Sequence, residues 1–352
     1  MPQAKATQCD GNHIRAAPVR VGTRRRATES DCVWFSAPRR AVVVPASVRA
    51  PAEDEVLVRA TVSLISAGTE MLVYRGEATA GDLLPPNCRG TFSFPVKYGY
   101  QCVGRVEHAG PRSGFSAGDR VFARHPHQER FVTQARDTWV TRLPDSLSDD
   151  AAAFLNLARV ALTANLDVPV RAGEVALVFG QGIVGACCAL LARRSARRVI
   201  VVDPLPLRRE FAMRHGIDHA VAPGEADAVV RDITGGRGAD VTFEASGAVA
   251  ALASAVTLTA KRGTVVMLSY YGTKLVPLPD AFSRNAPRLV SSLAGTQRRW
   301  DAGRRTDATL ELLATLPVEE MISARVPFRE APRAYEMVDE QRDRMLGVVL
   351  DY

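Results

Sequence analysis

Three glycines near the middle of the chain, Gly180, Gly182 and Gly185, have the spacing of a nucleotide-binding turn. They follow a continuous apolar run, EVALVFG, which is typical of a buried parallel strand, and they open an apolar helix, IVGACCALLARR. The first glycine would permit a tight turn, the second would admit a pyrophosphate to the backbone, and the third would let helix and strand pack closely. The phosphates would lie at the positive N-terminus of the helix, at Ile183 and Val184.

Asp203 ends the next apolar run, RVIVVD, 18 residues after the last of these glycines. A carboxylate at this place accepts hydrogen bonds from the adenosine ribose hydroxyls and repels a 2′-phosphate. The sequence therefore favours NAD(H) as cofactor. NADP(H) stays possible because Arg208 and Arg209 follow closely. We interpret these two arginines as solvated residues at the start of a helix, and we keep Arg208 as a candidate cofactor contact.

Strand and helix patterns alternate after the glycine motif, which predicts a doubly wound parallel sheet over residues 166–300. Earlier in the chain, short β-rich runs are broken by Pro and Gly, which is typical of a β-rich or barrel-like domain. Between the two regions, SLSDDAAAFLNLARVALTANL predicts one helix with a Ser cap. We predict an α/β fold in which residues 31–165 and 301–352 form the β-rich domain.

The bulk composition fits a two-domain globular protein and disfavours several other classes. The chain has 352 residues, 47% of them hydrophobic, and its apolar runs are far shorter than the ~20 residues of a membrane helix. Residues 1–30 hold six basic and two acidic residues, so +4 of the net charge of +7 lies in a predicted disordered tail and no nucleic-acid surface is expected. The six cysteines form no CxxC pair, which predicts reduced thiols and a cytoplasmic protein.

Several stretches resemble the medium-chain dehydrogenase/reductase superfamily. They are EVLVRATVSLISAGTE, KYGYQCVGRVEHAG, SAGDRVFA and GQGIVG. ISAGTE and HPHQERFV resemble more narrowly the zinc-type alcohol dehydrogenase-like subgroup, to which bacteriochlorophyllide dehydrogenases are related. The resemblance implies an NAD(P)-dependent dehydrogenase with a GroES-like catalytic domain and a Rossmann domain. It also implies a homodimer formed through the edge strand RLVSSLAG.

The residues that bind zinc in zinc-dependent members of this family are replaced in this chain. Those members place a Cys in the region that reads SAGTE here, and a His in a Gly-His-Glu triplet that reads Gly99-Tyr100-Gln101 here. Hydroxyl and amide side chains do not suit a tetrahedral Zn²⁺ site. The chain also has no Cys between Cys102 and Cys187, where many members hold a structural zinc. We therefore predict a protein without zinc.

The resemblance places several catalytic candidates in one cleft. His127 is the leading acid/base candidate because imidazole titrates near neutrality, although a histidine bonded to backbone in a turn is an equal alternative. Tyr100 would donate a hydrogen bond to a carbonyl or would only fill the former metal site. Thr69 matches a proton-relaying hydroxyl. Glu70 matches a carboxylate behind the metal, with a structural carboxylate paired with an arginine as an equal alternative. His125, which precedes a proline, is expected to point outward.

Further candidates lie on the cofactor side. Ser246 follows DVTFEA and would pass the cofactor, and Ser269, Tyr270 and Tyr271 follow GTVVML and would reach the nicotinamide. Four arginines near the end of this region would meet an anionic substrate or, as we prefer, lie in solvent or at a dimer interface: Arg284, Arg288, Arg298 and Arg299.

We consider three functions. The first is a zinc-independent, NAD(H)-dependent oxidoreductase that interconverts a secondary alcohol and a ketone on a small polar molecule, such as a cyclitol, a sugar or an intermediate of secondary metabolism. The second is a zinc-free C=C reductase of the enone or quinone type, which commonly uses NADPH. The third is a non-catalytic nucleotide-binding protein. Residues 71–95 and 272–300 are expected to line the substrate pocket.

Overall fold

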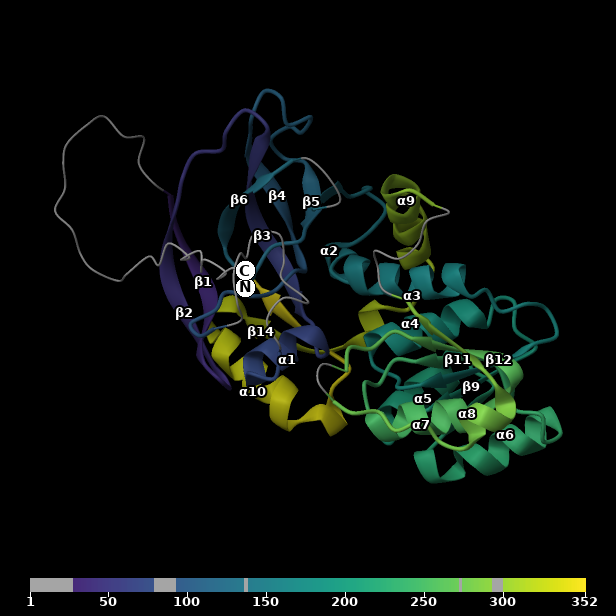
Figure 1. Ribbon diagram of the computed structural model, residues 1–352. Helices are drawn as coiled ribbons and strands as arrows, with labels where there is room; N and C mark the ends of the chain where they lie inside the picture. Colours follow the sequence, from purple (N-terminus) through teal and green to yellow (C-terminus); the bar gives the residue numbers. More distant parts are fainter. Residues whose placement is uncertain (1–27, 79–92, 136–138, 272–273, 293–299) are drawn as a thin grey trace, which may run out of the picture.

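The computed structural model describes residues 28–78, 93–135, 139–271, 274–292 and 300–352. Figure 1 shows two lobes, one built from the first and last parts of the chain and the other from its middle. The predicted tail lies outside the described residues except for its last three positions, which begin strand β1 (Thr28–Ala37).

The first lobe consists mainly of β-strands and carries two short helices. Strands β1 and β2 (Arg40–Val48) form an antiparallel pair. A seven-stranded sheet contains β3 (Glu55–Ile65), β4 (Cys102–Ala109), β5 (Arg120–Ala123), β6 (Arg130–Gln134), β7 (Val140–Arg142), β14 (Ile322–Pro327) and β15 (Gly347–Asp351). Helices α1 (Thr69–Arg75) and α10 (Ala331–Glu340) lie near each other at its lower end in Figure 1.

The C-terminal strand returns to the first lobe. Strand β15 runs antiparallel to β3, with Val348 opposite Ile65 and Asp351 opposite Val62, and β14 pairs with β15 in parallel. Residues more than 280 positions apart in the chain are thereby hydrogen-bonded in one sheet. The C-terminal return expected from the sequence pattern is present as a paired strand.

The second lobe is a six-stranded parallel sheet in the order β10-β9-β8-β11-β12-β13. Its strands are β8 (Val175–Phe179), β9 (Arg198–Val202), β10 (His219–Val221), β11 (Ala239–Glu244), β12 (Thr259–Met267) and β13 (Arg288–Ser291). Its helices are α4 (Ile183–Ala192), α5 (Pro206–Arg214), α6 (Ala226–Thr234), α7 (Val249–Leu258) and α8 (Ala281–Asn285). The strand order reverses between β8 and β11, which is the place where doubly wound sheets bind their ligands. The predicted α/β fold class is confirmed.

The helix predicted between the two lobes is divided into two. Ser148 caps the short helix α2 (Asp149–Ala152) by accepting a hydrogen bond from the N–H of Ala151, at 3.0 Å. Helix α3 (Leu155–Asp167) then starts after a turn at Ala153 and Phe154. Helix α3 packs against α4 and α9 (Ala302–Leu313), so it is the layer beside the cofactor helix (Figure 1).

Strand β13, the start of RLVSSLAG, forms one edge of the parallel sheet. This edge is the position that the predicted homodimer requires, and the dimer stays a prediction. Among the described residues, no helix is both long and apolar enough to cross a membrane.

A buried ion pair lies inside the first lobe, between Glu70 of α1 and His127 of the turn after β5. Neither side chain has exposed area, and Nε2 of His127 lies 2.9 Å from Oε1 of Glu70. The other ring nitrogen, Nδ1, lies 2.6 Å from Oγ of Ser63. Glu70 also accepts hydrogen bonds from the Tyr335 hydroxyl and, at 3.0 Å, from the N–H of Ser66.

This cluster connects early and late parts of the chain. Tyr335 belongs to α10, and the hydroxyl of Tyr352, one residue after β15, lies 2.9 Å from Oγ of Ser63. Burial by itself lowers the pKa of His127. The charge of Glu70 and hydrogen bonds with Cys102 and Glu70 outweigh burial and raise this pKa to about 10. The imidazole is therefore a cation held by a carboxylate near neutral pH.

We expect the free energy of unfolding to fall as the pH rises from about 6.5 to about 10. In this window the folded protein keeps a proton on His127 that the unfolded chain has lost, so the stabilisation is complete below the unfolded pKa and disappears above the folded one. Denaturant titrations across this range measure the slope, which His127→Gln should flatten.

A variant of Glu70, which pairs with His127, supplies the control. Glu70→Gln should cost about 3–5 kcal/mol because it leaves a buried cation without its carboxylate. The double variant His127→Gln/Glu70→Gln should recover part of that loss. An unchanged pH slope in His127→Gln would contradict the assignment.

Candidate active site

The glycine turn has the geometry of a phosphate cradle. Gly180 has φ +85°, and a Cβ on it would lie 2.8 Å from the backbone of Ser246. A Cβ on Gly185 would lie 1.9 Å from the carbonyl oxygen of Gly180. Gly182 is different, because the nearest atom to its Cβ position is Nη1 of Arg208, 4.0 Å away. Two glycines are thus needed for packing, and the third leaves the backbone open to a ligand at the N-terminus of α4.

The start of α4 also touches the first lobe. Ile183 is buried, and its Cδ1 would lie 3.5 Å from a Cβ placed on Gly347 of β15. Val184, the next residue, is half-buried. The predicted cofactor contacts Ile183 and Val184 therefore lie where the two lobes meet.

Asp203 is buried after β9 and faces the same loop. Its Oδ2 accepts a hydrogen bond from the N–H of Gln181 at 2.7 Å, and its Oδ1 accepts one from the N–H of Leu205 at 2.9 Å. Nη1 of Arg208 lies 3.6 Å from Oδ2. Arg209 donates to the carbonyl oxygen of Asp203 at 2.8 Å. Both arginines thus point back at the loop, which corrects their interpretation as solvated residues.

Sequence reasoning missed Glu244, the buried carboxylate at the end of β11. It accepts hydrogen bonds from the N–H groups of Ser246 and Gly247, at 2.7 and 3.2 Å, and from the Tyr271 hydroxyl. Burial first, and then the charge of Glu244, raise the pKa of Tyr271 above its ordinary value. Ser269 donates to the carbonyl oxygen of Glu244 at 3.4 Å. Glu244 therefore positions the predicted cofactor-side residues, and a carboxylate inside the apolar run DVTFEA was the signal for it.

Tyr100 forms a hydroxyl pair with Ser66. The Tyr100 hydroxyl donates a hydrogen bond to Oγ of Ser66 at 2.6 Å, and 9% of Tyr100 is exposed. Burial raises the pKa of Tyr100 to about 12, while hydrogen bonds with Ser66 and Thr69 and the charge of Arg124 act in the opposite direction. Thr69 is half-buried next to two exposed residues, so the pair is connected toward the surface.

The side chains at the position where the family resemblance places zinc ligands are Ser66, Tyr100 and Gln101. Ser66 and Tyr100 are occupied with each other, and the amide of Gln101 is buried with its nitrogen donating to the carbonyl oxygen of Leu64 at 3.4 Å. Nowhere in the described part of the chain do three or more His, Cys, Asp or Glu side chains form a group that could hold a metal ion. Hydroxyls and an amide lack the soft or anionic donors of a zinc site, so these residues do not fit a catalytic zinc.

The two other predicted catalytic side chains lie behind this pair. His127 and Glu70 are fully buried, and both ring nitrogens of His127 are engaged. This geometry does not suit the acid/base role suggested for His127, since a base must reach its substrate. His125 is buried too, against the expectation that it points outward, and it stacks on Phe131 with ring centroids 3.9 Å apart.

The structure says less about the remaining predicted residues. Arg284 and Arg288 are exposed, as the preferred interpretation expected, and Arg298 and Arg299 lie outside the described residues. Tyr270 is half-buried in the loop after β12. The predicted pocket-lining segments fall partly on residues 79–92, 272–273 and 293–299, which are also outside the described part.

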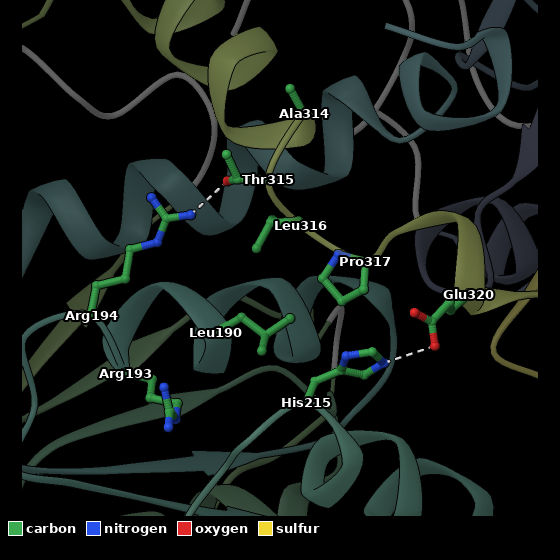
Figure 2. A pocket seen from close by; sticks show the side chains of 9 residues that line it. All are labelled: Leu190, Arg193, Arg194, His215, Ala314, Thr315, Leu316, Pro317 and Glu320. Atoms are coloured by element: carbon green, nitrogen blue, oxygen red, sulfur yellow. Dashed lines mark hydrogen bonds and ion pairs between the residues drawn. The ribbon is translucent and has the colours of Figure 1, made fainter.

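A cavity of about 470 Å³ lies at the other end of α4 (Figure 2). Its polar side chains are already engaged: Arg194 donates to Oγ1 of Thr315 at 2.7 Å, and His215 lies 3.1 Å from Glu320. Because α4 separates it from the glycine turn, this cavity is not the cofactor site.

Comparisons with known proteins agree with the fold. The family model described as zinc-binding dehydrogenase matches residues 183–306. D-guloside 3-dehydrogenase of Shigella flexneri is 28% identical over 342 residues, covering 88% of this chain and 97% of that enzyme.

Two solved structures share the fold. One is a zinc-binding dehydrogenase from Sinorhizobium meliloti 1021 bound to NADP, with a TM-score of 0.75 and 19% identity, covering 92% of this chain and 100% of that one. The other is an alcohol dehydrogenase from Escherichia coli CFT073 in complex with NADH, with a TM-score of 0.76 and 16% identity, covering 92% and 99%. The chain is thus similar to known dehydrogenases over most of its length, and it shares the fold of the two solved structures.

Proposed function

We propose that this protein is a zinc-independent oxidoreductase that interconverts a secondary alcohol and a ketone on a small polar substrate of the sugar or cyclitol class. The observation that carries the proposal is the hydrogen bond of 2.6 Å between Tyr100 and Ser66. It stands where the family resemblance places zinc ligands, and it supplies a hydroxyl donor in their place. The sugar class is supported by the likeness to D-guloside 3-dehydrogenase.

In this proposal Tyr100 is the acid/base group. A bound nicotinamide supplies or accepts the hydride. Because its pKa is raised to about 12, Tyr100 stays protonated near neutral pH and can donate to a substrate carbonyl oxygen during reduction. Without substrate, the phenol proton is donated to Ser66. To protonate a carbonyl, Tyr100 would turn that proton to the substrate and accept one from the Ser66 hydroxyl, which half-buried Thr69 would resupply from solvent.

The cofactor in this proposal is preferentially NAD(H). Asp203 presents its carboxylate beside the glycine turn, where a 2′-phosphate would be repelled. Arg208 lies 3.6 Å from that carboxylate and faces Gly182, so it would contact the pyrophosphate more directly than the adenosine ribose.

Removing the phenol should nearly abolish turnover. Tyr100→Phe should lower kcat about 10²–10⁴-fold, the usual contribution of a positioned proton donor, and leave the Kd for NADH nearly unchanged. Tyr74→Phe is a matched control, because Tyr74 is also buried in this lobe and its hydroxyl only donates to the carbonyl oxygen of Arg39 at 2.9 Å. Equal kcat values for both variants would rule out Tyr100 as the acid.

Chelation should leave the activity intact. After dialysis against a strong chelator, the purified enzyme should retain its turnover because no group at Ser66 or Tyr100 depends on a metal ion. Elemental analysis of the active sample gives the zinc content. Stoichiometric zinc, with activity lost on chelation and restored by Zn²⁺, would contradict the proposal.

Replacing the carboxylate should reverse the cofactor preference. Asp203→Ser should weaken NADH binding and strengthen NADPH binding, measured by fluorescence titration of the full-length protein, because the repulsion of a 2′-phosphate is removed. A wild-type protein that strongly prefers NADPH and reduces enones but not ketones would support the C=C reductase alternative instead.

A further inference from the structure

Three arginines from elements far apart in the sequence act electrostatically on one another, and one of them, Arg124, also acts on Tyr100. Arg124 follows β5, Arg159 lies on α3, and Arg305 lies on α9. Helices α3 and α9 pack against each other (Figure 1). The charges of Arg124 and Arg305 act together with burial to lower the pKa of Arg159 to about 10, so the three cations are close enough to repel one another.

Among the three arginines, Arg159 gives the clearest evidence for a missing partner. Only 6% of it is exposed, although a charged side chain is rarely buried unless it is paired. Its Nη2 donates to Oδ1 of Asn156 at 2.7 Å, one turn earlier on the same helix, and its Nε is buried without a hydrogen-bond partner among the described residues. Part of the guanidinium is therefore unsatisfied at a place closed to bulk water.

Arg124 also has a buried guanidinium nitrogen without a partner in the described chain. Its guanidinium carbon lies 4.1 Å from the centroid of the Trp139 ring, so one face is covered by the indole. Its Nε is also buried without a partner among the described residues. Its charge and those of Tyr98 and Tyr100 act on one another, so it lies within electrostatic range of the proposed proton donor.

Two other arginines whose side chains are mostly buried have carboxylate partners, although Nη2 of Arg75 also lacks a hydrogen-bond partner within the described chain. Nε of Arg75 lies 2.6 Å from Asp339, and Nη2 of Arg120 lies 2.5 Å from Asp149. No carboxylate among the described residues forms an ion pair with Arg124 or Arg159. Burying unpaired charge is costly, and a guanidinium edge matches the paired oxygens of a carboxylate or phosphate. The missing partner is thus expected to be an anion that arrives with the substrate.

We propose that Arg124 and Arg159 bind an anionic group of the substrate, a carboxylate or a phosphate ester, beside the alcohol or ketone that Tyr100 contacts. This inference rests on the proposed function, since it names the substrate class of the same site. It replaces the four arginines near residue 290 as the place where an anionic substrate is recognised.

The test is calorimetric titration of the full-length protein loaded with NADH, using three probes. D-gluconate carries a carboxylate, D-sorbitol 6-phosphate carries a phosphate, and D-sorbitol is neutral. At least one anion should bind about 10-fold or more tightly than sorbitol. The tighter of the two identifies the group. Equal or tighter binding of sorbitol would overturn the inference.

Variants that remove one positive charge test whether Arg124 and Arg159 bind the anion. Arg124→Gln and Arg159→Gln should each weaken binding of the preferred anion about 10- to 100-fold and leave sorbitol binding unchanged. Arg171→Gln is the surface control, because that side chain is 78% exposed beside Glu174. Anion affinities of the two variants that equal that of Arg171→Gln would overturn the assignment.

Two further readouts separate folding and turnover from binding. Because Arg159 has no carboxylate partner, Arg159→Gln should keep its melting temperature, whereas Arg75→Gln, which leaves buried Asp339 with only the exposed arginines Arg39 and Arg342, should lower it. Tight anion binding without turnover of any alcohol or ketone would support this inference and overturn the proposed function. Turnover of sorbitol, together with anions that bind no more tightly than sorbitol, would support the proposed function and overturn this inference.

Discussion

The ion pair between His127 and Glu70 is the contact on which the geometry of the first lobe depends. Oε2 of Glu70 holds the N–H of Ser66, the residue that accepts the Tyr100 hydrogen bond. On the other side, a Cβ on Gly99 would lie 2.8 Å from Cδ2 of His127, and Gly99 has φ +132°, so the imidazole fits only against a glycine immediately before Tyr100. The buried pair therefore fixes both members of the hydroxyl pair without reaching the substrate.

The same pair explains why the C-terminal strand must return. A buried imidazolium and carboxylate are expensive unless their remaining hydrogen-bonding groups are satisfied. Tyr335 satisfies Glu70, and Tyr352 satisfies Ser63 behind His127. Both tyrosines come from the last 18 residues of the chain. The catalytic half of the molecule is thus complete only after the Rossmann half has been made and the chain has come back.

The features that the sequence predicts well are those with a local cause. Alternating apolar runs, the glycine turn and Asp203 need only neighbouring residues, and each stands where the pattern placed it. The burial of His127 was not predictable in this way, because it depends on Glu70 and Tyr335, 57 residues before and 208 after it in sequence. A charged residue inside the apolar stretch AFLNLARVAL could have drawn attention to Arg159, but the charges of Arg124 and Arg305 beside it follow only from packing.

The hydroxyl pair and Arg124 are coupled electrostatically. A phenol with a pKa of about 12 is a weak acid, and in the proposed zinc-independent reaction the alkoxide of the alcohol would need stabilisation from the protein. Arg124 acts electrostatically on the phenol and would supply positive charge there. If a substrate anion binds to Arg124 as proposed, that charge is partly neutralised and the pKa of Tyr100 moves upward. Since the phenol is already protonated near neutral pH, this rise makes it a poorer acid, so in the proposal anion recognition through Arg124 is gained at some cost to proton transfer.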